Sequence, residues 1–482
     1  MTGTRAAPPT KKPARTGAGG ARWLLPAAAL LSLVPSPPAS ATDLWSHGES
    51  RLSISGSLRE LGQIGSQTSQ DAFANAIAQD VLVGGQTRCL VAAEFADCPA
   101  FDTVGQKDAW QALTRLRTRV DLQVVDGLEA VVVYDHELTV GVLDTFEANL
   151  ATSFQRDDLL DADWTLVSSD RVEWRHRLYR SFVRLTKGPL DLTVGRQRIA
   201  WGVGRLWNPI DRFNAIPPLA VEPDQTQGID SVDARWSFNG FDYAEAVYAP
   251  GSSRDEARYA LRWHGVVHDT DLSLMGGVFE QAPTAGVDLA RNLGDAAIRL
   301  EVVYTDPHQK VWKLDASGPR RPDDFFQVVA GIDYTFDVAN GIYVLAEHLY
   351  NGNALGFGRG RAGSLLPLFE ATSTPPPGLP SGVPGPYVTP GSASLFGSSQ
   401  VVTSAEQQTG FLVGGDITPE LRLELLSIYD WNGQSAAFFP SLRYTPADSL
   451  EVTVGVQTFA GPRRSQYGGA ETFVYLLADL FF

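Results

Sequence analysis

Alternation of apolar and polar residues along most of the chain is the feature that most constrains the fold. The run 450–459, for example, places Leu450 and Val452 on one face and Glu451 and Thr453 on the other. Side chains of a β-strand alternate between its two faces with a period of two residues. The pattern recurs in runs of about ten residues, the length of a strand that crosses a bilayer at a tilt. It predicts strands with one apolar and one polar face.

Short turn signals separate these runs in pairs, and longer connections separate the pairs. The short turns contain residues that supply a positive or a fixed φ, and they lie at Asp126-Gly127, Lys187-Gly188-Pro189, Asn239-Gly240, His268-Asp269-Thr270, Gly294-Asp295, Asp337 to Gly341, Thr418-Pro419-Glu420 and Pro446-Ala447-Asp448. The longer connections are 65–112, 142–170, 205–227, 250–254, 282–286, 307–324, 354–406, 433–435 and 463–470. This count predicts about 18 strands, with 16 as the alternative.

A closed barrel accounts for these strands better than a soluble β-sandwich does. Both folds share the period of two, but the amount of predicted sheet exceeds what one water-soluble core without helices holds. Aromatic residues such as Trp236, Trp263 and Tyr334 lie near the strand ends of the apolar faces, as the interfacial girdles of membrane barrels require. The predicted fold is an all-β, transmembrane antiparallel β-barrel.

The first 41 residues have the three parts of a secretory signal peptide. An acid-free basic stretch precedes the apolar residues 24–34 (LLPAAALLSLV), and Ala39-Ser40-Ala41 follows as a small-residue cleavage site. We therefore expect residues 1–41 to be removed on export and residues 42–482 to form the barrel.

The C-terminal residues 471–482 (ETFVYLLADLFF) alternate and end on an aromatic residue. This segment resembles the closing strand of Gram-negative outer-membrane proteins, a porin-like class of barrels. The resemblance implies that Tyr475, Leu480 and Phe482 belong to a signal read by the barrel-assembly machinery. It also implies residence in the cell outer membrane of a Gram-negative bacterium, with membrane lipid and lipopolysaccharide as partners.

Arginines on the polar faces predict a wet interior, because an Arg that faces lipid at the midplane costs about 2–4 kcal/mol. The predicted pore-lining residues are Arg115, Arg117, Arg119, Asp121, Arg180, Arg184, Arg235, Arg258, Arg262, Arg299, Glu301 and Glu347. Two interpretations stay open: a charged wall that selects solutes, or Arg–carboxylate pairs that only brace the wall. In the run 190–200, Arg196 and Arg198 break the alternation, either through a bulge near Gly195 or because they lie at the outer rim.

The connection 205–227 is unusually rich in proline and apolar residues, which predicts a loop that folds inward as a constriction. We expect Trp207 to supply apolar contact there and Arg205, Asp211 and Arg212 to face the solute. The alternative is a loop that packs on the rim or on a neighbouring subunit.

Two other connections have distinct compositions. Loop 65–112 contains Cys89 and Cys98, the two cysteines of the chain, and a possible short helix at 69–82; in an oxidising compartment they predict one local disulfide. Loop 354–406 is rich in Gly, Pro and Ser and is expected to be flexible.

The predicted function is an outer-membrane porin for passive diffusion of small hydrophilic solutes through an Arg-lined lumen. Alternatives are a transporter of hydrophobic compounds with a plugged lumen and a structural or adhesive surface barrel. None of the seven histidines lies in a catalytic motif, so we expect no enzyme, cofactor or metal site. The net charge of −16 disfavours nucleic acid as a partner. A homotrimer is one arrangement open to the chain.

Overall fold

The computed structural model describes most of the predicted barrel. The described residues are 41–68, 106–141, 159–169, 171–214, 228–306, 313–315, 318–320, 324–338, 340–352, 354, 369–372, 387–390, 405–462, 465–467 and 472–482. Residues 1–40 of the predicted signal peptide, the predicted helix 69–82, and both Cys89 and Cys98 lie outside these residues.

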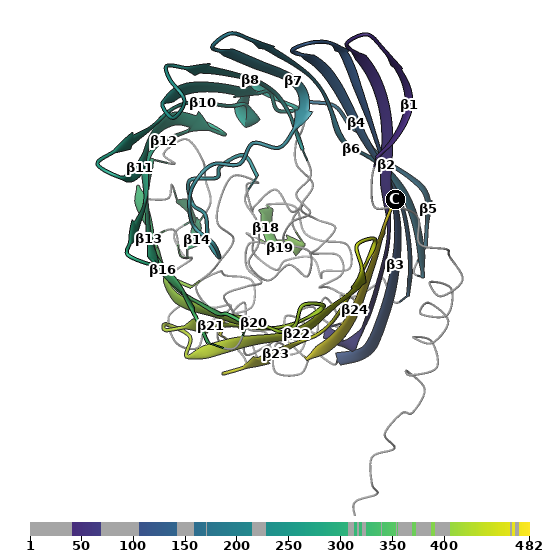
Figure 1. The fold of residues 1–482 in the computed structure, drawn as a ribbon. Coiled ribbons are helices and arrows are strands. Elements are labelled where there is room, and N and C mark those ends of the chain that lie inside the picture. The colour runs from purple at the N-terminus through teal and green to yellow at the C-terminus, as the bar shows by residue number, and fades with distance from the viewer. Residues whose placement is uncertain are drawn as a thin grey trace, which may run out of the picture. The chain divides into compact units, whose positions relative to one another are not determined.

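Eighteen antiparallel strands form a closed ring (Figure 1). In ring order these strands are β2 (Ser50–Thr68), β3 (Gln106–Val125), β4 (Leu128–Gly141), β6 (Val172–Lys187), β7 (Leu190–Gln197), β8 (Ile229–Ser237), β9 (Tyr243–Ala249), β10 (Arg258–Val267), β11 (Thr270–Phe279), β12 (Ala282–Leu293), β13 (Ala296–Thr305), β16 (Phe325–Phe336), β17 (Ile342–Asn351), β20 (Gln407–Thr418), β21 (Leu421–Asp430), β22 (Ser435–Ala447), β23 (Leu450–Ala460) and β24 (Phe473–Phe481). Pairing of β24 with β2, from Ser57↔Phe481 to Gly65↔Phe473, closes the ring. The predicted fold class and the count of 18 are confirmed.

All eight predicted short turns join paired neighbouring strands. The predicted connection 282–286 is wrong, because these residues belong to β12 and the turn lies at Glu280 and Gln281. Glu280 has φ +50° and Gln281 has φ +69°. Two-residue hairpins with positive φ at both positions favour Asn and Gly. The Glu-Gln pair has neither residue type, so the turn could not be recognised from the sequence.

Two further strands extend the edges of long ring strands. Strand β1 (Thr42–His47) pairs with β2. It lies on the same edge of β2 as β24, beyond the point where Phe482 exchanges backbone hydrogen bonds with Gly56. Strand β5 (Asp163–Ser168) pairs with β6 beyond the point where β7 separates from it. Both strands supply backbone partners that a long edge otherwise lacks.

The remaining short elements lie in or directly after the predicted loops. They are a 3-10 turn, η3 (Arg254–Glu256), and two hairpins, β14 (Lys313–Asp315) with β15 (Gly318–Arg320), and β18 (Phe369–Thr372) with β19 (Tyr387–Pro390). The predicted loop 65–112 is shorter than expected, because β2 and β3 stay paired as far as Thr68↔Gln106.

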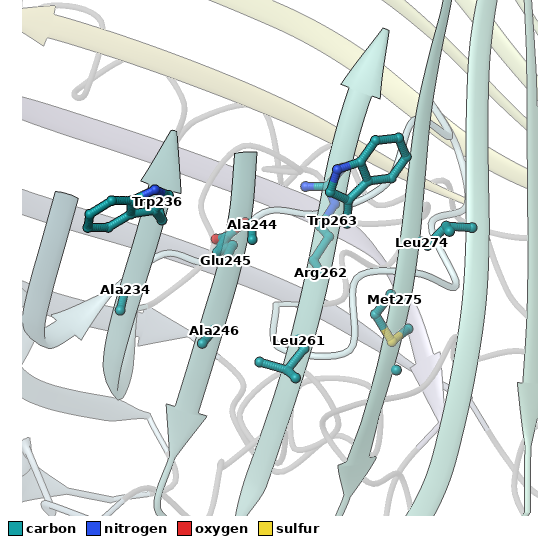
Figure 2. A pocket seen from close by; sticks show the side chains of 11 residues that line it. Ala234, Trp236, Ala244, Glu245, Ala246, Leu261, Arg262, Trp263, Leu274 and Met275 are labelled. Carbon is teal, nitrogen blue, oxygen red and sulfur yellow. The ribbon is translucent and has the colours of Figure 1, made fainter. Parts of the chain in front are cut away.

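The outward faces of the ring carry exposed apolar side chains, such as Leu116, Leu261 and Phe411. One part of this surface is a shallow apolar hollow with Ala244 and Ala246 between Trp236 and Trp263 (Figure 2). Charged residues such as Arg117 on β3 and Asp135 on β4 lie on the opposite, inward faces. Among the described residues, no helix is long and apolar enough to span a bilayer.

Candidate functional site

Cross-strand ion pairs organise the predicted arginine row on β3. Arg115 Nε lies 2.6 Å from Glu137 Oε1, and Arg117 donates a 2.6 Å hydrogen bond to Asp135. Asp135 and Glu137 on β4 are 0% and 2% exposed. Strand register sets these contacts, because Arg117 lies opposite Asp135 and Arg115 opposite Glu137. Both predicted arginines are therefore neutralised by their neighbours, as the bracing interpretation expects.

Arg119 is more exposed than Arg115 and Arg117, the other two arginines of its row. Its guanidinium pairs with Asp121 on the same strand, 2.6 Å away, and 44% of its side chain is exposed. Exposed ion pairs of this kind contribute little to stability.

The other predicted pore-lining arginines also have partners on the inner face. Arg184 pairs with Glu129 at 2.8 Å, and Arg299 pairs with Asp333. The guanidinium of Arg235 lies over the ring of Tyr243, 3.7 Å from its centroid. Arg180 lies 5.1 Å from the ring centroid of Tyr179. Arg235 is exposed and Arg180 is partly buried.

Arg196, which breaks the alternation in the sequence, lies on the outer face of the ring. Its pairing with Ser181 continues a register without a bulge. The guanidinium donates to Asp230 at 2.9 Å and to the carbonyl of Leu160 at 2.7 Å. The residue is 3% exposed. The register excludes the bulge at Gly195, and Arg196 lies on the outer face near the end of β7, where it contacts Leu160.

The chain leaves the wall after Gln197 and runs inside the ring as residues 198–214, here named the inward segment (Figure 1). Its residues overlap the first part of the predicted constriction loop. The second part, 215–227, lies outside the described residues. The inward placement predicted for the loop therefore applies to the described part.

Glu301 on β13 anchors the first half of the inward segment. One carboxylate oxygen accepts hydrogen bonds from the backbone N–H groups of Val203 and Gly204, both at 2.6 Å. The other oxygen accepts from the N–H of Ile210 at 3.1 Å. Glu301 is 0% exposed, so its two oxygens accept hydrogen bonds from protein donors in place of water.

Glu347 on β17 anchors the next three residues in the same way. Its carboxylate accepts from the backbone N–H groups of Arg205 at 2.8 Å, Leu206 at 2.9 Å and Trp207 at 2.8 Å. Glu347 is 1% exposed. Together, the two carboxylates accept from six backbone donors of a short irregular stretch that has no sheet partners. Sequence reasoning placed both acids on the inner face and missed this anchoring role.

Apolar packing holds the inward segment to the wall on both sides of these anchors. Trp201, Ile210 and Phe213 join a buried cluster with side chains of the wall from β8 to β13. Trp207 joins a second cluster with side chains from β16, β17, β21 and β22. Burial of a side chain of this size stabilises by about 1.5–3 kcal/mol relative to exposure.

Wall glycines make room for the segment. A Cβ at Gly410 would lie 2.3 Å from Leu206 Cδ1, and a Cβ at Gly286 would lie 2.6 Å from Ile210 Cδ1. Within the segment, Gly202 has φ +86°, and a Cβ at this position would lie 2.0 Å from Asn208 Oδ1. These glycines are a sequence signal that could have located the contact surface.

Of the three constriction residues predicted to face solute, Asp211 and Arg212 are buried; Trp207, predicted to supply apolar contact, is buried as well. Trp207 is 1%, Asp211 3% and Arg212 1% exposed. Asp211 accepts from the backbone N–H of Asn214 at 2.7 Å. Arg212 donates to Thr305 and Gln327 on the wall, each at 2.9 Å. Burial lowers the pKa of Arg212 to about 10, so the guanidinium stays charged at neutral pH.

Arg205 is the predicted constriction residue that is exposed, and Arg198 of the same segment is exposed as well. By contrast, Arg258, Arg262, Glu301 and Glu347, predicted to line the pore, are buried. The carbonyl of Phe213 lies 3.5 Å from Arg258, and Trp201 lies beside Arg262. The inward segment therefore contacts all four of these wall residues.

Comparison with known proteins finds distant structural likenesses alone. No protein-family model matches the chain, and no curated protein matches it. Among solved structures, OccK8 (OprE) of Pseudomonas aeruginosa is 9% identical with a TM-score of 0.48, over 89% of this chain and 98% of that one. OpdK of Pseudomonas aeruginosa, solved with vanillate, is 10% identical with a TM-score of 0.46 over the same shares. OccAB4 of Acinetobacter baumannii is 9% identical with a TM-score of 0.45, over 92% and 100%.

Proposed function

We propose that the chain is an outer-membrane channel through which small hydrophilic solutes diffuse passively. A closed ring of 18 antiparallel strands with an apolar outer face and a charged inner face supports this function. Closure leaves no unpaired sheet edge in the lipid. Rings of 16–18 strands are wide enough for an aqueous channel.

The observation that carries the proposal is the inward segment 198–214. It lies inside the ring and is fixed to the wall through Glu301 and Glu347. We propose that a segment in this position narrows the path, and that the exposed Arg198 and Arg205 face the lumen. We propose that these two exposed arginines, rather than the neutralised Arg115 and Arg117, interact with solutes.

Conductance of the purified mature protein in a planar lipid bilayer tests the function. Stepwise current increases that scale with salt concentration are expected. A heat-unfolded sample from the same preparation is the control. If folded protein inserts without any conductance, the channel function is rejected and a structural or adhesive barrel is favoured.

We extend the proposal to the partners that the sequence predicts. Assembly into the outer membrane would depend on Tyr475, Leu480 and Phe482 as the segment read by the barrel-assembly machinery. The position of Phe482 beside Gly56, at the closure of the ring, supports this role. Cross-linking in detergent tests for a homotrimer. An exclusively monomeric product would reject the trimer.

A further inference from the structure

We propose that Glu347, assisted by Glu301, is a positioning residue that holds Arg205 at the inner surface, and that Arg205 thereby sets the charge selectivity of the channel. This inference rests on the proposed channel function and assigns selectivity to one clamped side chain. Three observations support the inference: the backbone around Arg205 is fixed, its neighbours are buried, and no carboxylate among the described residues forms an ion pair with it.

The backbone of Arg205 is fixed on both sides. The N–H of Gly204 is bound by Glu301 at 2.6 Å, and the N–H groups of Arg205 and Leu206 are bound by Glu347 at 2.8 and 2.9 Å. Hydrogen bonds to a charged acceptor are the stronger kind in proteins. Three consecutive peptide groups thus have defined orientations, which determines the direction in which the Arg205 side chain leaves the backbone.

The neighbours of Arg205 face the wall. Trp207 is 1% exposed, and Leu206 lies against Gly410. Between Trp201 and Asn214, Arg205 is the one exposed residue. A rotation of the segment that turned Arg205 away from the lumen would have to lift Leu206 and Trp207 out of their contacts.

Arg205 also differs from the wall arginines in charge compensation. Arg115, Arg117 and Arg299 each pair with a carboxylate. Within the described part of the chain, no carboxylate forms an ion pair with Arg205. Glu347 accepts hydrogen bonds from the backbone N–H groups of Arg205, Leu206 and Trp207, and not from the Arg205 guanidinium. The guanidinium is left to interact with mobile ions and solutes.

Reversal potentials in a gradient of potassium chloride at low salt test the proposal. Arg205→Ala is expected to lower the anion-to-cation permeability ratio by about two- to fivefold, the effect of one unit charge a few ångströms from a passing ion. Glu347→Gln is expected to shift the ratio in the same direction, because the clamp is lost. Removal of a negative charge by itself would shift the ratio the opposite way, toward anions. The sign of the shift therefore separates positioning from simple charge loss.

Two matched controls accompany these variants. Glu451→Gln removes an inner-face carboxylate that pairs with Arg443 and not with the segment, so it should shift the ratio toward anions or leave it unchanged. Gly410→Ala displaces Leu206 without any change of charge and should shift the ratio toward cations, even if Glu347→Gln does not fold. Gly276→Ala, where a Cβ meets nothing within 4 Å, should match the wild type.

The double variant Arg205→Ala/Glu347→Gln completes the test. If Glu347 acts through Arg205, the double variant should be no more cation-selective than Arg205→Ala alone. A conducting wild type combined with an anion-directed shift in Glu347→Gln and no shift in Gly410→Ala would overturn the inference and leave the channel function intact. Absence of wild-type conductance would instead reject the channel function itself.

Discussion

The backbone N–H of Trp207 donates a 2.8 Å hydrogen bond to Oε1 of Glu347, a buried carboxylate 140 positions later in the chain. Each of the two groups supplies the hydrogen-bond partner that the other lacks. The N–H group belongs to an irregular segment without a strand partner, and the carboxylate has been removed from water. Because an unpaired buried charge is costly, the wall and the inward segment are expected to form together and to be lost together.

Gly202→Ala tests this mutual dependence from the side of the segment. Gly202 has φ +86°, and a Cβ there would lie 2.0 Å from Asn208 Oδ1 and 2.6 Å from Glu301 Oε1. The added methyl group should displace residues 202–210 from Glu301 and expose the peptide bond after Arg205 to trypsin. Limited proteolysis in detergent, followed by mass spectrometry of the fragments, measures this change.

Gly188→Ala is the matched control for Gly202→Ala. Gly188 also has a positive φ, +55°, but a Cβ there meets nothing within 4 Å. Backbone strain alone costs about 1 kcal/mol at such positions, and both variants share it. Equal tryptic cleavage after Arg205 in the two variants would show that the contact with Glu301 does not hold the segment.

Asp135→Ala tests the ion pairs of the inner wall. Asp135 is 0% exposed and accepts two hydrogen bonds from Arg117, at 2.7 and 2.6 Å. Removal of one partner from a buried pair destabilises by roughly 3–5 kcal/mol. The variant should lose its folded electrophoretic mobility at a lower temperature. It should also shift the reversal potential toward anions, because Arg117 is no longer neutralised.

Arg119→Ala is the contrasting variant on the same strand. Its pair with Asp121 is 44% and 32% exposed, so its stability contribution is expected to be small. If Asp135→Ala and Arg119→Ala unfold at the same temperature, burial does not distinguish the two pairs.

The strands were predictable from sequence because their signals are local. The alternation at 450–459 corresponds to β23, and the Asp126-Gly127 turn joins β3 to β4. The turn at Glu280 and Gln281 was missed because these residue types are atypical for positive φ. Strand β5 was missed because its role, to cover the edge of β6 beyond β7, depends on where another segment leaves the sheet.

The candidate site was predictable in part. Proline and apolar content indicated that residues from Arg205 onward fold inward. Which side chains of the segment face the wall depends on contacts with β13 and β17, about 90 to 140 positions away. The sequence therefore suggested Asp211 and Arg212 as solute contacts, whereas these side chains satisfy backbone and wall groups.

Asp230→Asn tests whether the buried pair on the outer side of the wall is separate from the channel. Arg196 donates two hydrogen bonds to Asp230, and Asp230 also accepts from the N–H of Leu160 at 2.9 Å. The variant should loosen residues near Leu160 and lower the unfolding temperature, because part of a buried charged network is lost. Conductance and selectivity should stay at wild-type values. A changed reversal potential would contradict the outer placement of this pair.

Variants of Phe482 separate the contribution of its backbone from that of its aromatic side chain to the assembly of the barrel. Its backbone N–H and carbonyl both bond to Gly56, at 3.0 and 2.7 Å, whereas its ring carries the resemblance to a closing-strand signal. Phe482→Ala keeps the backbone bonds and removes the ring; deletion of Phe482 removes both. We expect Phe482→Ala to lower the amount of protein recovered from the outer membrane while the recovered protein unfolds near the wild-type temperature, since each backbone bond contributes about 1 kcal/mol. The deletion should lower both quantities, as measured by membrane fractionation and heat-dependent electrophoretic mobility. If Phe482→Ala is recovered from the outer membrane in wild-type amounts, the aromatic side chain is not part of the assembly signal. Phe482 would then act only in the closure of the barrel.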